Sequence, residues 1–365
     1  IRIIGSIKSV LIVTDKQMVK FGYVKKLQEL LSKEGFKSNV FDETIPDPTD
    51  TIVLNGINAL KKNKNDAVIG FGGGSPIDTA KAIAVLSQHS KNIQDYKPPG
   101  TFDKKGLPII AIPTTAGTGS EVTHHSVIID TKSNNQEKIS CRGEGFVPIV
   151  SIIDYELTLS KPRRLTIDSA IDTLTHGIEA YVSKKANSFS DAQAIASMKL
   201  IFPNLRSVYK NGNDKKAREK VMFGSTLAGM AFSNASVALV HGMSRPIGAN
   251  YHVPHGLSNA MLLPTVTKFS ISGSPLRYSE CAKVMGIAFK NDEQDVANEK
   301  LINELYNLNK DLDVPSLLEY GIEKEDFISK LDILAKQAID SGSPANNPII
   351  PSHGEIKDLY LKLWS

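Results

Sequence analysis

The sequence has little cysteine and tryptophan: Cys141, Cys281 and one tryptophan among 365 residues. Two cysteines cannot supply the disulfide framework on which small secreted proteins depend, so that class is excluded. No apolar run reaches the roughly 20 residues of a membrane-spanning helix, and no signal-peptide pattern opens the chain. The chain begins with Ile1 rather than Met, so we expect a truncated N-terminus and, by default, a cytoplasmic protein.

The sequence also lacks a strong charge of one sign. Its formal net charge is +4, and lysines and acids are interspersed without a block of like charges. This pattern gives no support to nucleic-acid or membrane partners. The hydrophobic fraction of 41% is ordinary for a globular protein, and a chain of 365 residues usually forms two compact units.

The first part of the chain alternates apolar strands with helices. Strands are predicted at 9–13, 38–41, 66–71, 107–112 and 149–153, and helices at 19–31, 51–60 and 76–86. Continuous apolar strands separated by helices predict a parallel sheet that is covered on both faces. From about residue 165 the sequence is helix-compatible throughout, with long helices expected near 190–208 and 221–231. We therefore predict an α/β domain at 1–158 and an all-α domain at 159–365.

Two polar loops follow predicted strands and are candidates for binding a nucleotide. The segment 72–75 reads Gly-Gly-Gly-Ser before a helix, and the segment 113–120 is rich in threonine and glycine. Glycines let the backbone approach a phosphate, and a helix N-terminus adds free amide groups and a positive dipole end. A simple chain reversal explains a glycine loop equally well, but two such loops in one sheet favour a diphosphate ligand. Asp15 ends another strand, where it suits either a ribose diol or a helix N-cap.

Asp172 and His176 are four residues apart, so on a helix their side chains share one face. Such a pair is more often structural than metal-binding. However, three of the eight histidines, His241, His252 and His255, lie within fifteen residues, each bordered by glycine or proline. One carboxylate with several imidazoles is a mixed nitrogen and oxygen set that suits Fe(II) or Zn(II) without distinguishing them.

Four strings resemble the iron-containing, or group III, alcohol dehydrogenases: GGGSPIDTAKAIA (72–84), IPTTAGTGSEVT (112–123), IDTLTHGIEAYVS (171–183) and LVHGMSRPIGANYHVPHGLSNAMLLP (239–264). The resemblance covers essentially the whole chain in order. It implies a dehydroquinate synthase-like fold: a dinucleotide-binding α/β domain, then an all-helical metal-binding domain, with the active site in the cleft between them. The implied metal ligands are Asp172, His176, His241 and His255. The implied cofactor residues are Asp15, Gly73, Gly74, Ser75, Asp78, Thr114, Thr115, Thr118 and Lys138.

The resemblance also implies a reaction. It predicts an NAD(P)-linked oxidoreductase that interconverts small primary alcohols or diols and aldehydes, with hydride passing between the substrate carbon and the nicotinamide. The metal, Fe(II) or possibly Zn(II), would lower the pKa of the bound alcohol so that the alkoxide forms. Asp15 matches the acid that favours NAD over NADP, and a homodimer or larger homo-oligomer is expected.

One departure from the family concerns proton transfer. Most members carry a second histidine four residues after the position of His241, where this chain has Arg245. An arginine keeps its proton near neutrality and is a poor general base. His252 lies nearby in the sequence and is our candidate for the missing proton shuttle.

Three other interpretations remain open at this point. Arg245 could instead bind an acidic substrate, which keeps a hydroxy-acid/keto-acid oxidoreductase or a maleylacetate reductase-like enzyme as the alternative. Glycerol dehydrogenases and dehydroquinate synthases share the architecture, but the HGM and VPHG strings speak against them. A nucleotide-binding or metal-binding protein without turnover would bind NADH and consume no carbonyl compound.

Overall fold

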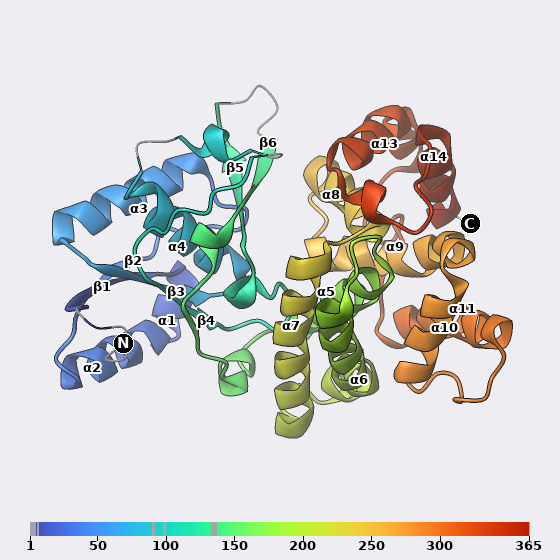
Figure 1. The fold of residues 1–365 in the computed structure, drawn as a ribbon, viewed down its shortest axis with the longest axis horizontal. Coiled ribbons are helices and arrows are strands. Elements are labelled where there is room, and N and C mark those ends of the chain that lie inside the picture. Colours follow the sequence, from blue (N-terminus) through green and yellow to red (C-terminus); the bar gives the residue numbers. More distant parts are fainter. Residues whose placement is uncertain (1–4, 6, 90–91, 98–99, 133–136, 365) are drawn as a thin grey trace. The chain divides into compact units, whose positions relative to one another are not determined.

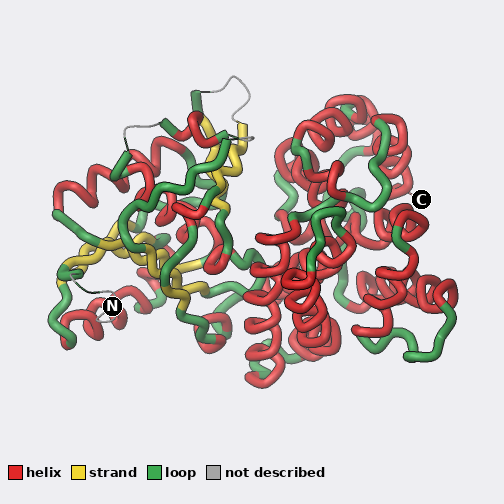
Figure 2. Tube along the Cα trace, in the orientation of Figure 1, coloured by secondary structure: helices red, strands yellow, loops and turns green. Residues whose placement is uncertain are grey.

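The computed structural model describes residues 5, 7–89, 92–97, 100–132 and 137–364. By its internal contacts the chain divides into two compact units. The first contains Ile1–Thr115 and Gly119–Leu157, and the second contains Ala116–Thr118 and Thr158–Ser365. Strands lie in the first unit, and the described part of the second unit is helical (Figure 2). The predicted fold class, an α/β part with a parallel sheet followed by an all-helical part, is confirmed.

The first unit is built on a five-stranded parallel sheet with the order β2-β1-β3-β4-β7. The strands are β1 (Ser9–Val13), β2 (Lys37–Phe41), β3 (Ala67–Gly72), β4 (Ile109–Pro113) and β7 (Val150–Ser151). The helices of this unit are α1 (Lys16–Lys20), α2 (Tyr23–Lys33), α3 (Asp50–Asn63) and α4 (Gly74–Leu86) (Figure 1). The central strands β1, β3 and β4 are fully buried, which explains their continuous apolar sequences.

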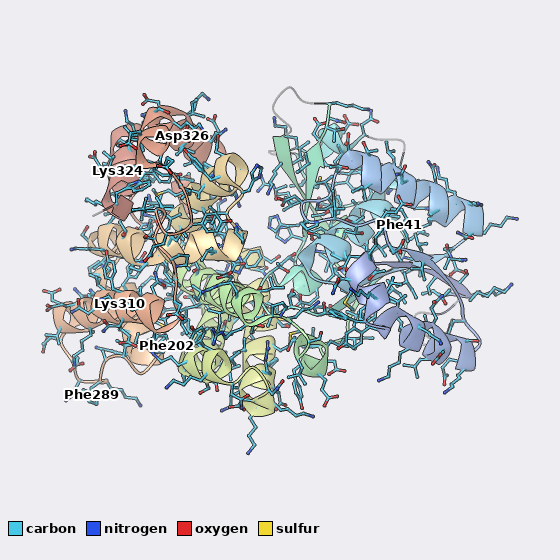
Figure 3. The ribbon with its side chains drawn as sticks, turned by 180° about the vertical axis from the view of Figure 1, so that it is seen from behind. Phe41, Phe202, Phe289, Lys310, Lys324 and Asp326 are labelled. Carbon is cyan, nitrogen blue, oxygen red and sulfur yellow. The ribbon has the colours of Figure 1, made fainter. Side chains whose placement is uncertain are left out.

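The two faces of this sheet carry separate apolar cores. On one face Leu11 and Val68 pack with side chains of α3 and α4. On the other face Ile12 and Ile69 pack with side chains of α1 and α2. Successive residues of a strand point to opposite faces, so each buried strand contributes to both cores. At the end of β2, the side chain of Phe41 is 4% exposed and lies against α3, so it belongs to the first of these cores (Figure 3). Not every phenylalanine is buried in this way: the side chain of Phe289, in the second unit, is 73% exposed.

Two sequence predictions in the first unit need correction, and one pair of strands was not predicted. The helix predicted at 19–31 is two helices, because Gly22 adopts a left-handed φ of 76° and becomes the N-cap of α2. The strand predicted at 149–153 is only two residues long. An antiparallel hairpin, β5 (His125–Asp130) with β6 (Glu137–Arg142), was not predicted at all.

The second unit is a set of packed helices: α5 (Arg163–Val182), α6 (Ser188–Lys210), α7 (Lys215–Ala235), α8 (Leu239–Tyr251), α9 (His255–Ser270), α10 (Pro275–Val284), α11 (Gln294–Asp311), α12 (Lys324–Ser329), α13 (Leu331–Asp340) and α14 (His353–Leu361). Helix α5 is buried along nearly its whole length and packs against α6, α7 and α9. Helix α8 packs against α9 and α13. Because α5, α8 and α9 meet in the interior, they can bring distant polar residues together.

Among the described helices, no single one is long and apolar enough to span a membrane. The pair α7 and α8 passes that test only when taken together, and it is bent by 104°.

Candidate metal centre and cofactor loops

The candidate cofactor loops begin at the carboxyl ends of neighbouring parallel strands. Strands β1 and β3 pair directly, and the chain leaves β1 toward β2 on one side and β3 toward β4 on the other. Such a switch point is where open α/β sheets bind ligands. Asp15 follows β1, and Gly72 ends β3. The predicted acid and the predicted glycine loop therefore lie at the same place on the sheet edge.

The glycine loop is built so that its backbone stays accessible. Gly72 has a φ of +153°, and a Cβ there would lie 2.6 Å from Cγ of Pro76, so only glycine fits. Gly73 is different: its φ is −75°, and an added Cβ would meet only the Thr115 side chain, at 3.5 Å. Gly73 is also the N-cap of α4 and provides no side-chain cap, so the amides of Gly74 and Ser75 at the start of this 13-residue helix are available to an anion.

Asp15 is the predicted helix N-cap, and its carboxylate also lies beside the glycine loop. Its Oδ1 accepts a hydrogen bond from the Met18 amide at 2.9 Å, which makes it the N-cap of α1. Its Oδ2 lies 3.5 Å from the position that a Cβ of Gly72 would take. A helix cap and a negative charge beside the glycine loop are therefore combined in one side chain.

Two other predicted cofactor residues are engaged within the first unit. The Asp78 carboxylate accepts hydrogen bonds from the Ser120 hydroxyl at 2.5 Å and from the Val127 amide at 2.9 Å. The Lys138 ammonium pairs with Asp47 at 2.7 Å. These contacts fix the loop after β4 and the β5–β6 hairpin, and they leave both carboxylate oxygens of Asp78 already bound to protein.

Lys81 was missed by the sequence analysis and is fully buried on α4. Its ammonium donates to the carbonyls of Thr123 and His125 at 2.9 and 2.8 Å. Burial lowers the pKa of Lys81 to about 8, although Asp78 favours the charged form. Together with Asp78, one turn earlier, Lys81 ties α4 to the segment that follows the second polar loop.

The threonines of that second loop fall into two groups. Thr114 is buried, and its amide donates to the Gly72 carbonyl at 2.8 Å. Thr115 lies beside Gly73, whereas Thr118 belongs by its contacts to the second unit and is exposed. Thr114 and Thr115 thus connect the second loop to the glycine loop at the carboxyl edge of the sheet. Ser75 is partly buried one residue after Gly74, in the first turn of α4.

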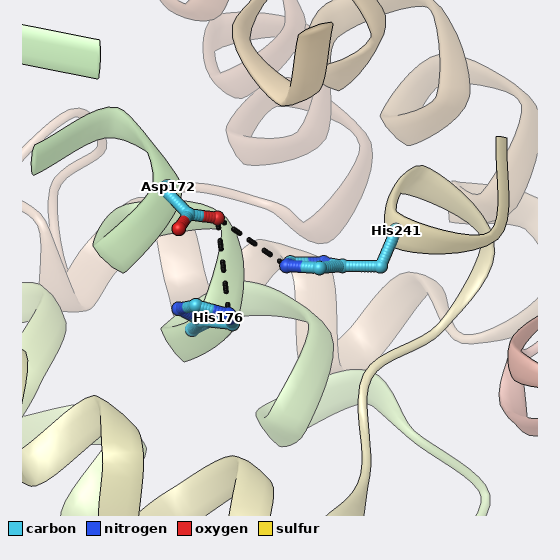
Figure 4. Close-up of side chains that lie close together, drawn as sticks. All are labelled: Asp172, His176 and His241. Atoms are coloured by element: carbon cyan, nitrogen blue, oxygen red, sulfur yellow. Dashed lines mark ion pairs between the residues drawn. The ribbon is translucent and has the colours of Figure 1, made fainter. Parts of the chain in front are cut away.

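The candidate metal ligands converge in the interior of the second unit (Figure 4). Asp172 and His176 come from α5, and His241 comes from α8. Each offers one potential ligand atom, and these three atoms lie within 4.8 Å of one another. Nε2 of His241 is 3.3 Å and Nε2 of His176 is 3.8 Å from the same oxygen, Oδ1 of Asp172. All three side chains are buried.

His255 joins this group from the first residue of α9. Its Nε2 lies 3.7 Å from Oδ1 of Asp172, and its side chain is 47% exposed against 4% for Asp172. The cluster therefore has a buried side formed by α5 and α8 and an accessible side formed by His255. Three imidazole nitrogens and one carboxylate oxygen around one point fit a divalent transition metal.

The charges of the cluster are strongly coupled. Burial disfavours the Asp172 carboxylate, but His176, His255 and His241 together hold its pKa well below the usual range. Burial lowers the pKa of His176 to about 3, so this imidazole is neutral and its lone pair is available. Burial also disfavours the His241 imidazolium, yet Glu179 and Asp172 raise its pKa to about 9. Protonation of His241 therefore competes with metal binding at this ring.

Two supporting residues around the cluster were not predicted from the sequence. Glu179 of α5 is buried and lies 2.6 Å from Nδ1 of His241. Asn259 of α9 donates to Oδ1 of Asp172 at 2.7 Å and lies 3.2 Å from Nε2 of His241. Both occur one turn after a candidate ligand, Glu179 after His176 and Asn259 after His255, and that spacing is the signal that could have revealed them.

The candidate proton shuttle, His252, and Arg245, which replaces the family's second histidine, both have exposed side chains. His252 is the C-cap of α8, with a φ of 55° and an exposed side chain, and its carbonyl accepts from the Tyr320 hydroxyl at 3.1 Å. Arg245 follows His241 by one helical turn and is exposed, with its guanidinium donating to Ser343 at 2.9 Å. Neither side chain belongs to the buried Asp172 cluster.

Comparison with known proteins agrees with this arrangement. The protein-family model "Iron-containing alcohol dehydrogenase" matches residues 2–155 of the chain. A second family model, "Fe-containing alcohol dehydrogenase family, C-terminal", matches residues 166–364. The chain belongs to the iron-containing alcohol dehydrogenase family. It is therefore an oxidoreductase of the alcohol dehydrogenase type, as the sequence strings predicted.

Relatives within the family show which reactions it includes. The chain is 36% identical to NADPH-dependent butanol dehydrogenase of Clostridium saccharobutylicum over 97% of its length and 90% of the relative. It is also 36% identical to NAD-dependent methanol dehydrogenase of Bacillus methanolicus, over 96% of this chain and 91% of that one. A crystal structure of 1,3-propanediol oxidoreductase superposes with a TM-score of 0.94 at 34% identity, covering 99% of this chain and 93% of the other. These names favour alcohols and aldehydes over the hydroxy-acid alternative.

Proposed function

We propose that this protein reversibly reduces small aldehydes to primary alcohols or diols with NADH, and that Asp172, His176, His241 and His255 hold the catalytic metal ion. The observation that carries the proposal is the convergence of the three buried ligand atoms of Asp172, His176 and His241 within 4.8 Å, with His255 beside them. Four neutral or anionic donors with one accessible side are the pattern of a catalytic rather than a structural metal site.

We assign cofactor binding to the first unit (1–158 by the sequence boundary) and metal binding to the second (159–365). The glycine loop and the free amides of α4 would bind the cofactor diphosphate. The residues that we propose for the cofactor are Asp15, Gly73, Gly74, Ser75, Asp78, Thr114, Thr115, Thr118 and Lys138. Asp78 also fixes the loop that follows β4. A bound divalent ion would supply Lewis-acid chemistry, which makes an alcohol more acidic and a carbonyl more electrophilic. We propose Fe(II), with Zn(II) as the other ion that suits this donor set.

The proposal is tested by metal-dependent turnover. Metal-stripped protein is loaded with Fe(II) or Zn(II) without oxygen, and NADH oxidation is followed against small aldehydes, hydroxyaldehydes and keto acids. We expect turnover of aldehydes only when metal is present. Turnover of keto acids alone would replace this proposal with hydroxy-acid chemistry at Arg245. Binding of metal and NADH without turnover of any carbonyl compound would indicate a binding protein.

Cofactor preference gives a prediction for Asp15. A carboxylate beside the glycine loop repels the 2′-phosphate of NADP, so Asp15→Ser should raise the ratio of kcat/KM for NADPH over NADH by about tenfold or more. Serine retains the N-cap hydrogen bond to the Met18 amide, so the free energy of unfolding should change by less than about 1 kcal/mol. If the ratio of kcat/KM for NADPH over NADH is unchanged, Asp15 does not determine the cofactor preference.

Proton transfer gives a prediction for His252. If this imidazole is the shuttle, His252→Ala should lower kcat by about 10²-fold and change the shape of the pH–rate profile. His353 is also an exposed histidine of the second unit, so His353→Ala is the matched control. A His252→Ala profile that matches the wild type would leave the shuttle to another group.

For assembly we propose a homodimer or larger homo-oligomer, supported by the family resemblance. Sedimentation analysis of the 39.7 kDa chain tests this directly. A single species at the monomer mass would contradict it.

A further inference from the structure

Glu179 is a buried carboxylate that the proposed reaction does not use directly. It is 3% exposed and lies on α5, three residues after His176. Among the described ion pairs, its partner is His241 rather than a lysine or arginine. An isolated buried carboxylate is costly, so the contacts that compensate it indicate why it is there.

Both oxygens of Glu179 accept hydrogen bonds. Oε1 accepts from the Val240 amide at 2.6 Å, and the His241 amide lies 3.4 Å away. Oε2 lies 2.6 Å from Nδ1 of His241. An ionised carboxylate has no proton to donate, so Nδ1 must carry the proton. The first turn of α8 has no side-chain cap of its own, because its N-cap is Ala238, and Glu179 provides that cap from another helix.

The contact of Glu179 with Nδ1 of His241 also affects Nε2, the other nitrogen of the same ring. When Nδ1 is held as a donor, the lone pair of a neutral His241 is on Nε2. That nitrogen lies 3.3 Å from Oδ1 of Asp172, within the cluster of candidate ligand atoms. Glu179 therefore selects the tautomer and ring orientation in which His241 can bind a metal ion.

Charge balance supports the same role. Asp172 and Glu179 are the two buried carboxylates that contact His241, one on each side of its ring. Their two negative charges would equal the charge of one divalent ion when His241 is neutral. Without the charge of Glu179, Asp172 would be the one carboxylate paired with His241 among the described ion pairs.

We propose that Glu179 is a positioning residue for the metal site: it fixes His241 in the Nδ1-protonated tautomer and contributes one of two balancing charges. This inference rests on the proposed metal site of the second unit. The alternative interpretation is a purely structural role, in which Glu179 only caps the N-terminus of α8.

Glu179→Gln separates these two roles because an amide has only one acceptor oxygen. That oxygen can satisfy either the Val240 amide or Nδ1–H of His241, and the amide nitrogen then faces the other donor. The conflict is relieved when His241 moves its proton to Nε2, where it blocks metal binding. We expect the dissociation constants for Fe(II), Co(II) and Zn(II) to rise by about 10–100-fold, with a weakened Co(II) absorption spectrum.

The matched control is Glu280→Gln. Glu280 is a partly buried glutamate of the same unit that accepts one hydrogen bond, from the Tyr181 hydroxyl at 2.6 Å, and an amide oxygen can still accept it. Metal affinity of this variant should match the wild type. If Glu179→Gln also keeps wild-type metal affinity, whatever its melting temperature, Glu179 is only a cap and the inference is overturned.

A second measurement needs no variant, in case Glu179→Gln fails to fold. In Zn(II)-loaded wild-type protein, ¹⁵N NMR of the histidine rings should show His241 protonated at Nδ1 and bound to metal through Nε2. Coordination through Nδ1, or an unprotonated Nδ1, would overturn the inference. Failure of the metal site itself is distinguishable, because wild-type protein would then bind no metal that Asp172→Ala removes.

Discussion

Asp172→Ala is expected to remove the bound metal ion and to lower kcat/KM by about 10³-fold or more, equivalent to roughly 4 kcal/mol of transition-state stabilisation. Asp172 is the common point of the cluster, since Nε2 of His176, His241 and His255 all lie within 3.8 Å of its Oδ1. It is also the only one of the four candidate ligands with a negative charge. Without it, a divalent ion would meet imidazoles alone in a buried site.

The measurement pairs metal content with steady-state kinetics. Metal content per chain is determined after loading and gel filtration, and kcat/KM is measured with excess metal. Asp191→Asn is the control, because Asp191 forms an ion pair with Arg277 in the same unit, outside the cluster. If Asp172→Ala retained one metal ion per chain and near-normal kcat/KM, the catalytic metal would lie elsewhere.

Gly73→Ala is expected to weaken NADH binding by about tenfold or more while leaving the fold intact. A Cβ at this position fits within the protein, since its nearest neighbours are Thr115 atoms at 3.5 Å and φ is −75°. The same methyl group would project at the N-cap of α4, where a diphosphate must approach the free amides. If Gly73→Ala loses NADH affinity but keeps its stability, the added methyl group occupies space that the ligand needs and does not disturb packing within the protein.

Gly72→Ala provides the contrast for this prediction. Its Cβ would lie 2.6 Å from Pro76, and φ is +153°, so this variant should lose stability as well as NADH affinity. NADH binding is measured by fluorescence titration, and stability by urea unfolding. If Gly73→Ala and the wild type bind NADH with equal affinity, the glycine loop does not bind the cofactor.

The sheet could be predicted from the sequence because its central strands are buried on both faces. Strand β1 was predicted with its observed bounds, and β3 and β4 within two residues. The β5–β6 hairpin escaped prediction because it mixes exposed and buried positions, and its sequence has none of the continuous apolar character of the central strands. The break at Gly22 was missed because the apolar spacing of α2 continues back into α1.

Less of the candidate site than of the fold could be predicted from the sequence. The spacing of Asp172 and His176 follows from one helix, but their meeting with His241 depends on how α5 and α8 pack. Glu179 lies 62 residues from His241, and Asn259 lies 87 residues from Asp172. Helical spacing could mark Glu179 and Asn259 as neighbours of a candidate ligand on their own helix, but it does not show which distant residue each one contacts. The contacts of the Asp78 carboxylate with Ser120 and Val127, 42 and 49 residues away, were likewise not predictable from local spacing.

The most direct test of the account is X-ray absorption spectroscopy at the metal edge of Fe(II)- or Zn(II)-loaded protein, compared with Asp172→Ala. The account predicts a first shell of nitrogen and oxygen only, with the multiple scattering of three imidazoles, and its loss in the variant. Sulfur scattering, a shell with fewer than two imidazoles, or the same spectrum in Asp172→Ala would contradict it.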